Sequence, residues 1–327
     1  MLAERHLTPL NSVALLAVFV LASVLWFATL DYRHLIPTDE GRYAQMAREM
    51  MVSGDYITPR YNDYKYFEKP PLHIWALFGL GEWQARFWSG LTGYLTILLV
   101  GFTAAQLFGR VTGYLAALIL LSSPMWVVGG HFNALDMGLS AFLNLALCAL
   151  LLAQHAYEHQ RPQSGRHWMW VCWLAMGLAT LSKGLIGIVI PGMVLFAYIV
   201  TRFDWKILGR LHIFSGLVIF LIVTAPWFIA VSIETEFAHF FFIYEHFERF
   251  TATAHGRTAP FYFFLPLVLV GFLPWMPQFF QSARQTLMQY RMQSFSASWM
   301  LWLQSSLFSL AFPAQNYRAT SCRYFQP

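Results

Sequence analysis

The chain has 327 residues, of which 57% are hydrophobic, 18% aromatic and 11% charged, and its formal net charge is +5. Soluble domains carry about 25% charged residues, so this composition argues against a water-soluble protein and favours one that spans a lipid bilayer. The basic residues are scattered among apolar runs, which argues against nucleic-acid binding, and the cysteines show neither disulfide nor zinc spacing.

The first apolar run, Leu10–Leu30, has the length of a membrane span and continues into Asp31 without a cleavage site, so we expect it to be retained. The whole chain predicts about nine spans. The others are Phe87–Leu107, Val111–Val128, Ala134–Ala153, Trp168–Leu181, Leu185–Val200, Ile213–Val231, Phe261–Phe280 and Trp299–Phe312.

Basic residues of the short connections alternate onto one side of this arrangement, which predicts that side to be cytoplasmic. They are Arg5, Arg110, Arg161, Arg166, Arg202, Lys206, Arg210, Arg284 and Arg291. The long segment 31–86 falls on the other side. It is predicted to be the first extracytoplasmic loop.

Within that loop, Thr38 or Asp39 can cap a helix that begins after Pro37 and ends at Gly54. Its apolar residues recur at helical spacing, which predicts an amphipathic helix lying in the membrane interface. They are Tyr43, Met46, Ala47 and Met50. A stiff "FEKPP" run follows, because proline restricts the residue before it.

Two pairs of charges in the loop have both a structural and a functional interpretation. Asp39 and Glu40 at the helix start compensate the helix dipole, or supply a carboxylate as a base. Glu68 and Lys69 form a solvated pair, or place a cation for phosphate beside an acid that orients it or binds a metal.

Asp136 and Lys183 lie at the ends of predicted spans, where ionisable groups are costly and a functional role is expected. The alternatives are a helix cap for Asp136 and snorkelling to the interface for Lys183. A last cluster contains His239, Glu245, His246, Glu248, Arg249, His255 and Arg257. Glu245 and Arg249 can simply pair along a helix, and the histidines with acids fit a metal or acid–base site.

All of these groups fall on one predicted face of the membrane, which predicts an extracytoplasmic cavity with cations for phosphate and carboxylates for catalysis. The segment "IPTDEGRYAQMAREMMVSGDYITPRYNDYKYFEKPPLHIW" closely resembles the first extracytoplasmic loop of the bacterial aminoarabinose transferases. These belong to the protein O-mannosyltransferase-like family of membrane glycosyltransferases. "LSKG" and "EHFERF" resemble downstream patterns of that family.

The resemblance implies an all-α, polytopic bundle of the GT-C type with extracytoplasmic juxtamembrane helices. It implies a polyprenyl-phosphate sugar donor, a lipid A acceptor and an inner-membrane location with a periplasmic active site. Carried over by motif, Asp39 and Glu40 are the catalytic pair. Substrate-binding residues would be Arg42, Tyr43, Tyr66, Lys69, Asp136, Lys183 and Arg249. Glu68 and His246 would share a divalent metal, zinc or magnesium, with His255 as the alternative ligand.

The end of the chain departs from the family, whose members carry a further soluble C-terminal domain. Residues 1–312 are expected to form the transmembrane domain, and 313–327 are atypical. One back-translation of "AFPAQNYRATSCRYFQP" in another phase gives "FPGSKLPGYILPVFPA", similar to a family segment, so we expect a frameshifted, truncated product. Resequencing the gene tests this. Hexose transfer to protein or another glycan, a transporter and an inactive fragment remain alternative functions.

Overall fold

The computed structural model describes residues 9–37, 39–77, 79, 81–203, 205–237, 241, 264–278 and 280–281. This part of the chain is helical apart from a short antiparallel hairpin, β1 (Arg60–Tyr61) with β2 (Tyr64–Lys65). The helices are α1 (Pro9–Ala28), α2 (Glu40–Ser53), α3 (Leu72–Trp75), α4 (Glu82–Phe108), α5 (Arg110–Leu121), α6 (Pro124–Gly130), α7 (Leu135–Glu158), α8 (Pro162–Lys183), α9 (Ile186–Arg202), α10 (Ile207–Arg210), α11 (Ile213–Glu234), α13 (Phe264–Gly271) and the 3-10 turn η3 (Leu273–Trp275).

Within the described residues, three helices are long and apolar enough to cross a membrane: α4, α7 and α11. The pair α5 and α6 adds a fourth span if the two are taken together, although they meet at an angle of 66°. Shorter apolar helices cover Leu16–Ala28 and Ile186–Val200. The structure thus confirms a polytopic helical bundle, while the predicted run 299–312 lies outside the described residues.

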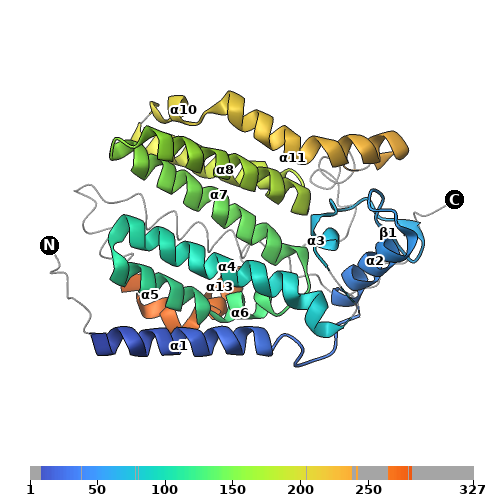
Figure 1. Cartoon of the computed structure of the whole chain (residues 1–327), viewed down its shortest axis with the longest axis horizontal. Coiled ribbons are helices and arrows are strands. Elements are labelled where there is room, and N and C mark those ends of the chain that lie inside the picture. Colours follow the sequence, from blue (N-terminus) through green and yellow to red (C-terminus); the bar gives the residue numbers. More distant parts are fainter. Residues whose placement is uncertain are drawn as a thin grey trace.

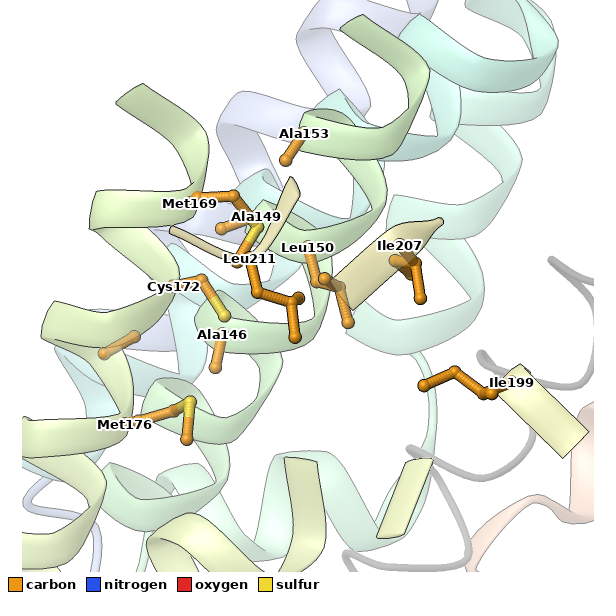
Figure 2. Close-up of a cluster of buried hydrophobic side chains, with 11 residues drawn as sticks. Ala146, Ala149, Leu150, Ala153, Met169, Cys172, Met176, Ile199, Ile207 and Leu211 are labelled. Atoms are coloured by element: carbon orange, nitrogen blue, oxygen red, sulfur yellow. The ribbon is translucent and has the colours of Figure 1, made fainter. Parts of the chain in front are cut away.

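The long helices lie side by side along the length of the molecule (Figure 1). Alanines on α7 and α8 allow a close approach, and the gap between them is filled by Met169, Cys172 and Met176. Figure 2 shows how Ile199, Ile207 and Leu211 complete this cluster from α9, α10 and the residue after α10. Small side chains at a helix contact are the usual way for helices to pack closely in a membrane.

The helices α2 and α3 and the hairpin gather at one end of the bundle, and α10 lies at the other (Figure 1). Gly54 ends α2 in the left-handed conformation, with φ of 73°. The buried residues of α2 include the four predicted apolar positions, Tyr43, Met46, Ala47 and Met50.

That apolar face packs against Tyr66, Ile74, Leu77 and Leu135, so it is covered by the protein itself. The prediction of an amphipathic helix is confirmed, and its apolar side is packed against other parts of the protein. The reason is that the hairpin and α3 fold back over α2 and supply a protein partner for it.

Candidate functional site

A buried ion pair holds the first loop to the bundle. Arg86 on α4 donates from Nε to Oε1 of Glu40 (2.8 Å) and from Nη2 to Oε2 (3.1 Å). Its remaining N–H groups bond to the carbonyl oxygens of Leu30, Arg33 and His34. All five donors of this guanidinium are therefore used, and its side chain is fully buried.

Glu40 is equally saturated. It accepts further hydrogen bonds from the Arg33 guanidinium and from the backbone N–H groups of Ile36 (3.0 Å) and Asn133 (2.9 Å). Burial alone would raise the pKa of Glu40, but the hydrogen bonds from the two guanidinium groups and two N–H groups lower it overall. Glu40 is thus an ionised carboxylate whose oxygens are both occupied by donors of the protein itself.

Asp39 precedes α2 at the N-cap position and makes no side-chain capping bond to the helix. Its Oδ1 instead lies 3.5 Å from Nη2 of Arg42, one turn along the helix. The capping interpretation from the sequence therefore does not describe Asp39. Its side chain is about 15% exposed, which makes it more accessible than the buried Glu40 carboxylate next to it.

Arg42 lies between two tyrosine rings. Its Cζ is 5.3 Å from the ring centroid of Tyr43 and 6.0 Å from that of Tyr66, distances typical of cation–π contacts. Its Nε is buried and has no hydrogen-bond partner among the described residues. Burial raises the pKa values of both Tyr43 and Tyr66, so both phenols stay protonated at neutral pH.

Glu68 and Lys69 lie beside this group on the extended run after the hairpin. The Tyr66 hydroxyl donates to Oε2 of Glu68 at 3.2 Å, and the charge of Glu68 acts on Arg42. Nζ of Lys69 donates to the Glu68 carbonyl oxygen at 2.9 Å. The two residues therefore do not form the simple side-chain pair that the sequence left open.

Asp136 at the start of α7 and Lys183 at the end of α8 form an ion pair. Both side chains are largely buried, with 10% and 15% exposed. The charges of Asp136 and Arg42 both act on the Tyr43 phenol. The structure thus brings together, at one end of the bundle, the predicted residues of the first loop and those of α7 and α8.

The sequence did not single out three residues that join these parts: Arg86, His73 and Asn133. Nε2 of His73 and Oδ1 of Asn133 are 3.0 Å apart, and the His73 ring packs edge-on against Tyr43. An arginine at the head of an apolar span was the one available signal for Arg86. No local pattern marks His73 or Asn133, because their partners come from other elements.

No group of three His, Cys, Asp or Glu side chains in the described part of the chain is arranged to hold a metal ion. Glu68 is described, but the other proposed ligands, His246 and His255, and the proposed substrate residue Arg249 lie outside the described residues. The metal prediction therefore stays a prediction, and no chemical step is derived from it.

Comparison with known proteins agrees with this architecture. The family model of dolichyl-phosphate-mannose-protein mannosyltransferase matches residues 68–229. The undecaprenyl phosphate-alpha-4-amino-4-deoxy-L-arabinose arabinosyl transferase of Edwardsiella ictaluri (strain 93-146) is 32% identical over 268 residues, or 79% of this chain and 47% of that protein. The corresponding transferase 1 of Sodalis glossinidius (strain morsitans) is 35% identical over 271 residues, or 80% of this chain and 47% of that protein.

The crystal structure of ArnT from Cupriavidus metallidurans bound to undecaprenyl phosphate superposes with a TM-score of 0.82 at 41% identity, covering 92% of this chain and 59% of that one. The apo structure of the same protein gives a TM-score of 0.76. This likeness defines the class, a polytopic helical protein with the GT-C fold. The chain belongs to the dolichyl-phosphate-mannose-protein mannosyltransferase family and is similar to its aminoarabinose transferases. It spans about half the length of the curated relatives it matches.

Proposed function

We propose that this chain binds a polyprenyl-phosphate sugar and transfers the sugar, with inversion, to lipid A at the periplasmic face of a bacterial inner membrane. The sugar that fits best is 4-amino-4-deoxy-L-arabinose. The names of the relatives and the undecaprenyl phosphate bound to ArnT from Cupriavidus metallidurans support the donor class. The connections that carry the basic residues lie at the opposite end of the bundle from α2 (Figure 1). Basic connections favour the cytoplasmic side, which supports a periplasmic position for the end that contains α2.

The observation that carries the proposal is the environment of Arg42. The Arg42 side chain is partly exposed, but its Nε is buried and has no acceptor among the described residues, and a buried donor without an acceptor is costly. Phosphate oxygens, like carboxylate oxygens, match the donor geometry of a guanidinium, and phosphate is the ionic group of a polyprenyl-phosphate donor. Asp39 lies on one side of this guanidinium and the protonated Tyr66 on another, so a phosphate there would be next to a carboxylate.

Sugar transfer from this donor breaks the bond between the anomeric carbon and a phosphate oxygen as the acceptor oxygen forms its bond to the same carbon. The leaving polyprenyl phosphate gains negative charge, and Arg42 and Lys183 would stabilise that charge as it develops. Lys69 is a third cation near the rim. Asp39 would take the proton of an acceptor hydroxyl, or orient the donor if the acceptor group is itself a phosphate.

Asp136 has a separate part in this proposal. It holds the Lys183 ammonium in place through their ion pair before the substrate arrives. A phosphate that reaches Lys183 then meets a cation already oriented, which reduces the entropy lost on binding. Glu68 would orient the Tyr66 hydroxyl in the same way, because its Oε2 accepts a hydrogen bond from that hydroxyl.

The test is complementation of a bacterial strain that lacks its lipid A aminoarabinose transferase. The native chain and its Asp39→Asn variant are produced at equal membrane levels, and lipid A is analysed by mass spectrometry. We expect the pentosamine adduct with the native chain and its loss with the variant. The matched control is Asp63→Asn, which changes an exposed acid at the hairpin turn, where asparagine tolerates the left-handed backbone.

An adduct that persists in Asp39→Asn would remove Asp39 from the reaction. No adduct with the native chain would contradict the proposed sugar and acceptor. The description of the matching family model favours one second candidate, transfer of a hexose to protein. Purified chain supplied with polyprenyl-phosphate mannose and a peptide acceptor distinguishes the two by which product forms.

A further inference from the structure

Asn133, in the connection between α6 and α7, links three separate elements of the site. Its backbone N–H donates to Oε1 of Glu40 at 2.9 Å, and its side-chain Nδ2 donates to the Glu40 backbone carbonyl at 3.1 Å. Its Oδ1 lies 3.0 Å from Nε2 of His73, on α3. The residue is fully buried, so none of these bonds competes with water.

The chemistry of these contacts fixes the orientation of both side chains. A carbonyl oxygen only accepts, so Nδ2 of Asn133 must point at Glu40 and Oδ1 must point at His73. Nε2 of His73 is therefore the protonated nitrogen. Burial lowers the pKa of His73 to about 4, so the ring is neutral at physiological pH and keeps this tautomer.

The positions of these residues in the chain give the contacts their significance. Glu40 directly follows Asp39, and Asn133 lies three residues before Asp136. The bonds between Glu40 and Asn133 thus join the backbone next to Asp39 to the backbone that leads into Asp136. His73 also contacts Tyr43 of α2, because the two rings pack edge-on with centroids 5.1 Å apart.

We propose that Asn133 is a positioning residue for the proposed transfer, one that sets where Asp39 lies relative to the Asp136–Lys183 pair through its bonds to Glu40 and His73. The inference rests on the proposed function. It also reassigns Glu40, which accepts two bonds from Asn133 and holds the start of α2, from the catalytic pair to the positioning network. A displacement of about 1 Å at a reacting group costs roughly 100-fold in rate, so a small change in this network is measurable.

The central experiment compares Asn133→Ala with Asn144→Ala in the purified full chain. Asn144 is a matched control because it is a buried asparagine on α7 whose Nδ2 donates within its own helix, to the Ser140 carbonyl oxygen at 2.7 Å. We expect Asn133→Ala to lower kcat by about 10- to 100-fold with KM for the donor changed less than about threefold. We expect Asn144→Ala to leave both constants near those of the native chain.

Two variants of His73 test whether the hydrogen bond itself matters. His73→Gln keeps a side-chain N–H near the place of Nε2, whereas His73→Leu removes the donor. Recovery of kcat by glutamine and loss with leucine would match the proposal. Equal kcat for the two variants, or equal effects of Asn133→Ala and Asn144→Ala, would overturn it.

A second readout does not depend on catalysis. Hydrogen exchange of amides in residues 39–44 and 131–137 reports on both ends of the linkage. We expect Asn133→Ala to raise exchange in both segments together, and Asn144→Ala in neither. If the native chain transfers no sugar but the coupled exchange is seen, the proposed function fails and the linkage stands. Exchange that changes in only one segment overturns the linkage itself.

Discussion

Arg86 and Glu40 form a two-point ion pair inside the protein, with Nε–Oε1 and Nη2–Oε2 distances of 2.8 Å and 3.1 Å. Both side chains are fully buried. They join the start of α4 to the start of α2, so the first loop is fixed to the bundle at the point where Asp39 emerges.

Removal of Arg86 should strongly destabilise the chain. In Arg86→Met, the Glu40 carboxylate stays buried with only part of its donors, and breaking a buried pair in this way costs about 3–5 kcal/mol. Equilibrium unfolding in detergent by SDS titration measures the change. The control is Arg60→Met, which breaks an exposed contact to Asp55 at 3.8 Å and should cost less than about 1 kcal/mol. Similar losses in the two variants would contradict a stabilising role for the buried pair.

The stability of the chain should fall as the pH drops from about 6.5 to about 4, because the pKa of His73 is about 6.5 in the unfolded chain and about 4 in the folded one. In this range His73 binds a proton in the unfolded state but not in the folded state. Above pH 6.5 both states are neutral and the effect vanishes. His73→Gln should remove this part of the pH dependence.

The lowered pKa of Glu40 acts in the same direction, since its contribution is also lost as the pH falls through the folded pKa. The Glu40 contribution therefore remains in the His73→Gln variant, whose free energy of unfolding should still fall with pH at lower pH values. Unfolding titrations of the native chain and His73→Gln at matched pH values separate the two groups. Parallel curves between pH 6.5 and 4 would show that His73 does not titrate as expected.

Replacing Asp136 and Lys183 together should separate structure from function. Asp136→Asn alone removes the carboxylate of a largely buried ion pair and should destabilise the chain. The double variant Asp136→Asn/Lys183→Met removes both charges, so stability should return toward that of the native chain. Lipid A modification should stay absent, because the proposed phosphate-stabilising cation is missing. Recovery of activity in the double variant would show the pair to be purely structural.

The contact between α4 and α5 should tolerate no side chain at Gly113. A Cβ there would lie 2.6 Å from both the Cβ of Ala105 and the Gly101 carbonyl oxygen. Gly113→Ala should therefore separate the helices and destabilise the chain by about 1–3 kcal/mol. Gly192→Ala on α9 is the control, because a Cβ there meets nothing within 4 Å and alanine favours the helix. The SDS midpoints of the two variants should move in opposite directions.

The apolar periodicity of α2 was enough to predict its buried face, since residues three and four apart share one side of a helix. Its end was predicted equally well, because Gly54 is the residue type that favours a left-handed backbone. The partner of that face was not predictable. Whether lipid or protein covers it depends on how the hairpin and α3 fold back, which no local pattern encodes.

The adjacent acids Asp39 and Glu40 show the same limit most clearly. Their position predicted a functional pair, and the apolar runs around them determined a polytopic membrane bundle, while the side on which each loop lies stays a prediction. Only the tertiary structure distinguished the two acids. Asp39 is the residue before the helix and Glu40 is its first residue; the Glu40 side chain turns inward to Arg86, while that of Asp39 lies beside Arg42 and is partly exposed. Arg86 and Asn133 reach Glu40 from 46 and 93 residues away. Such distant pairings form through packing of the whole bundle, and a linear sequence does not reveal them.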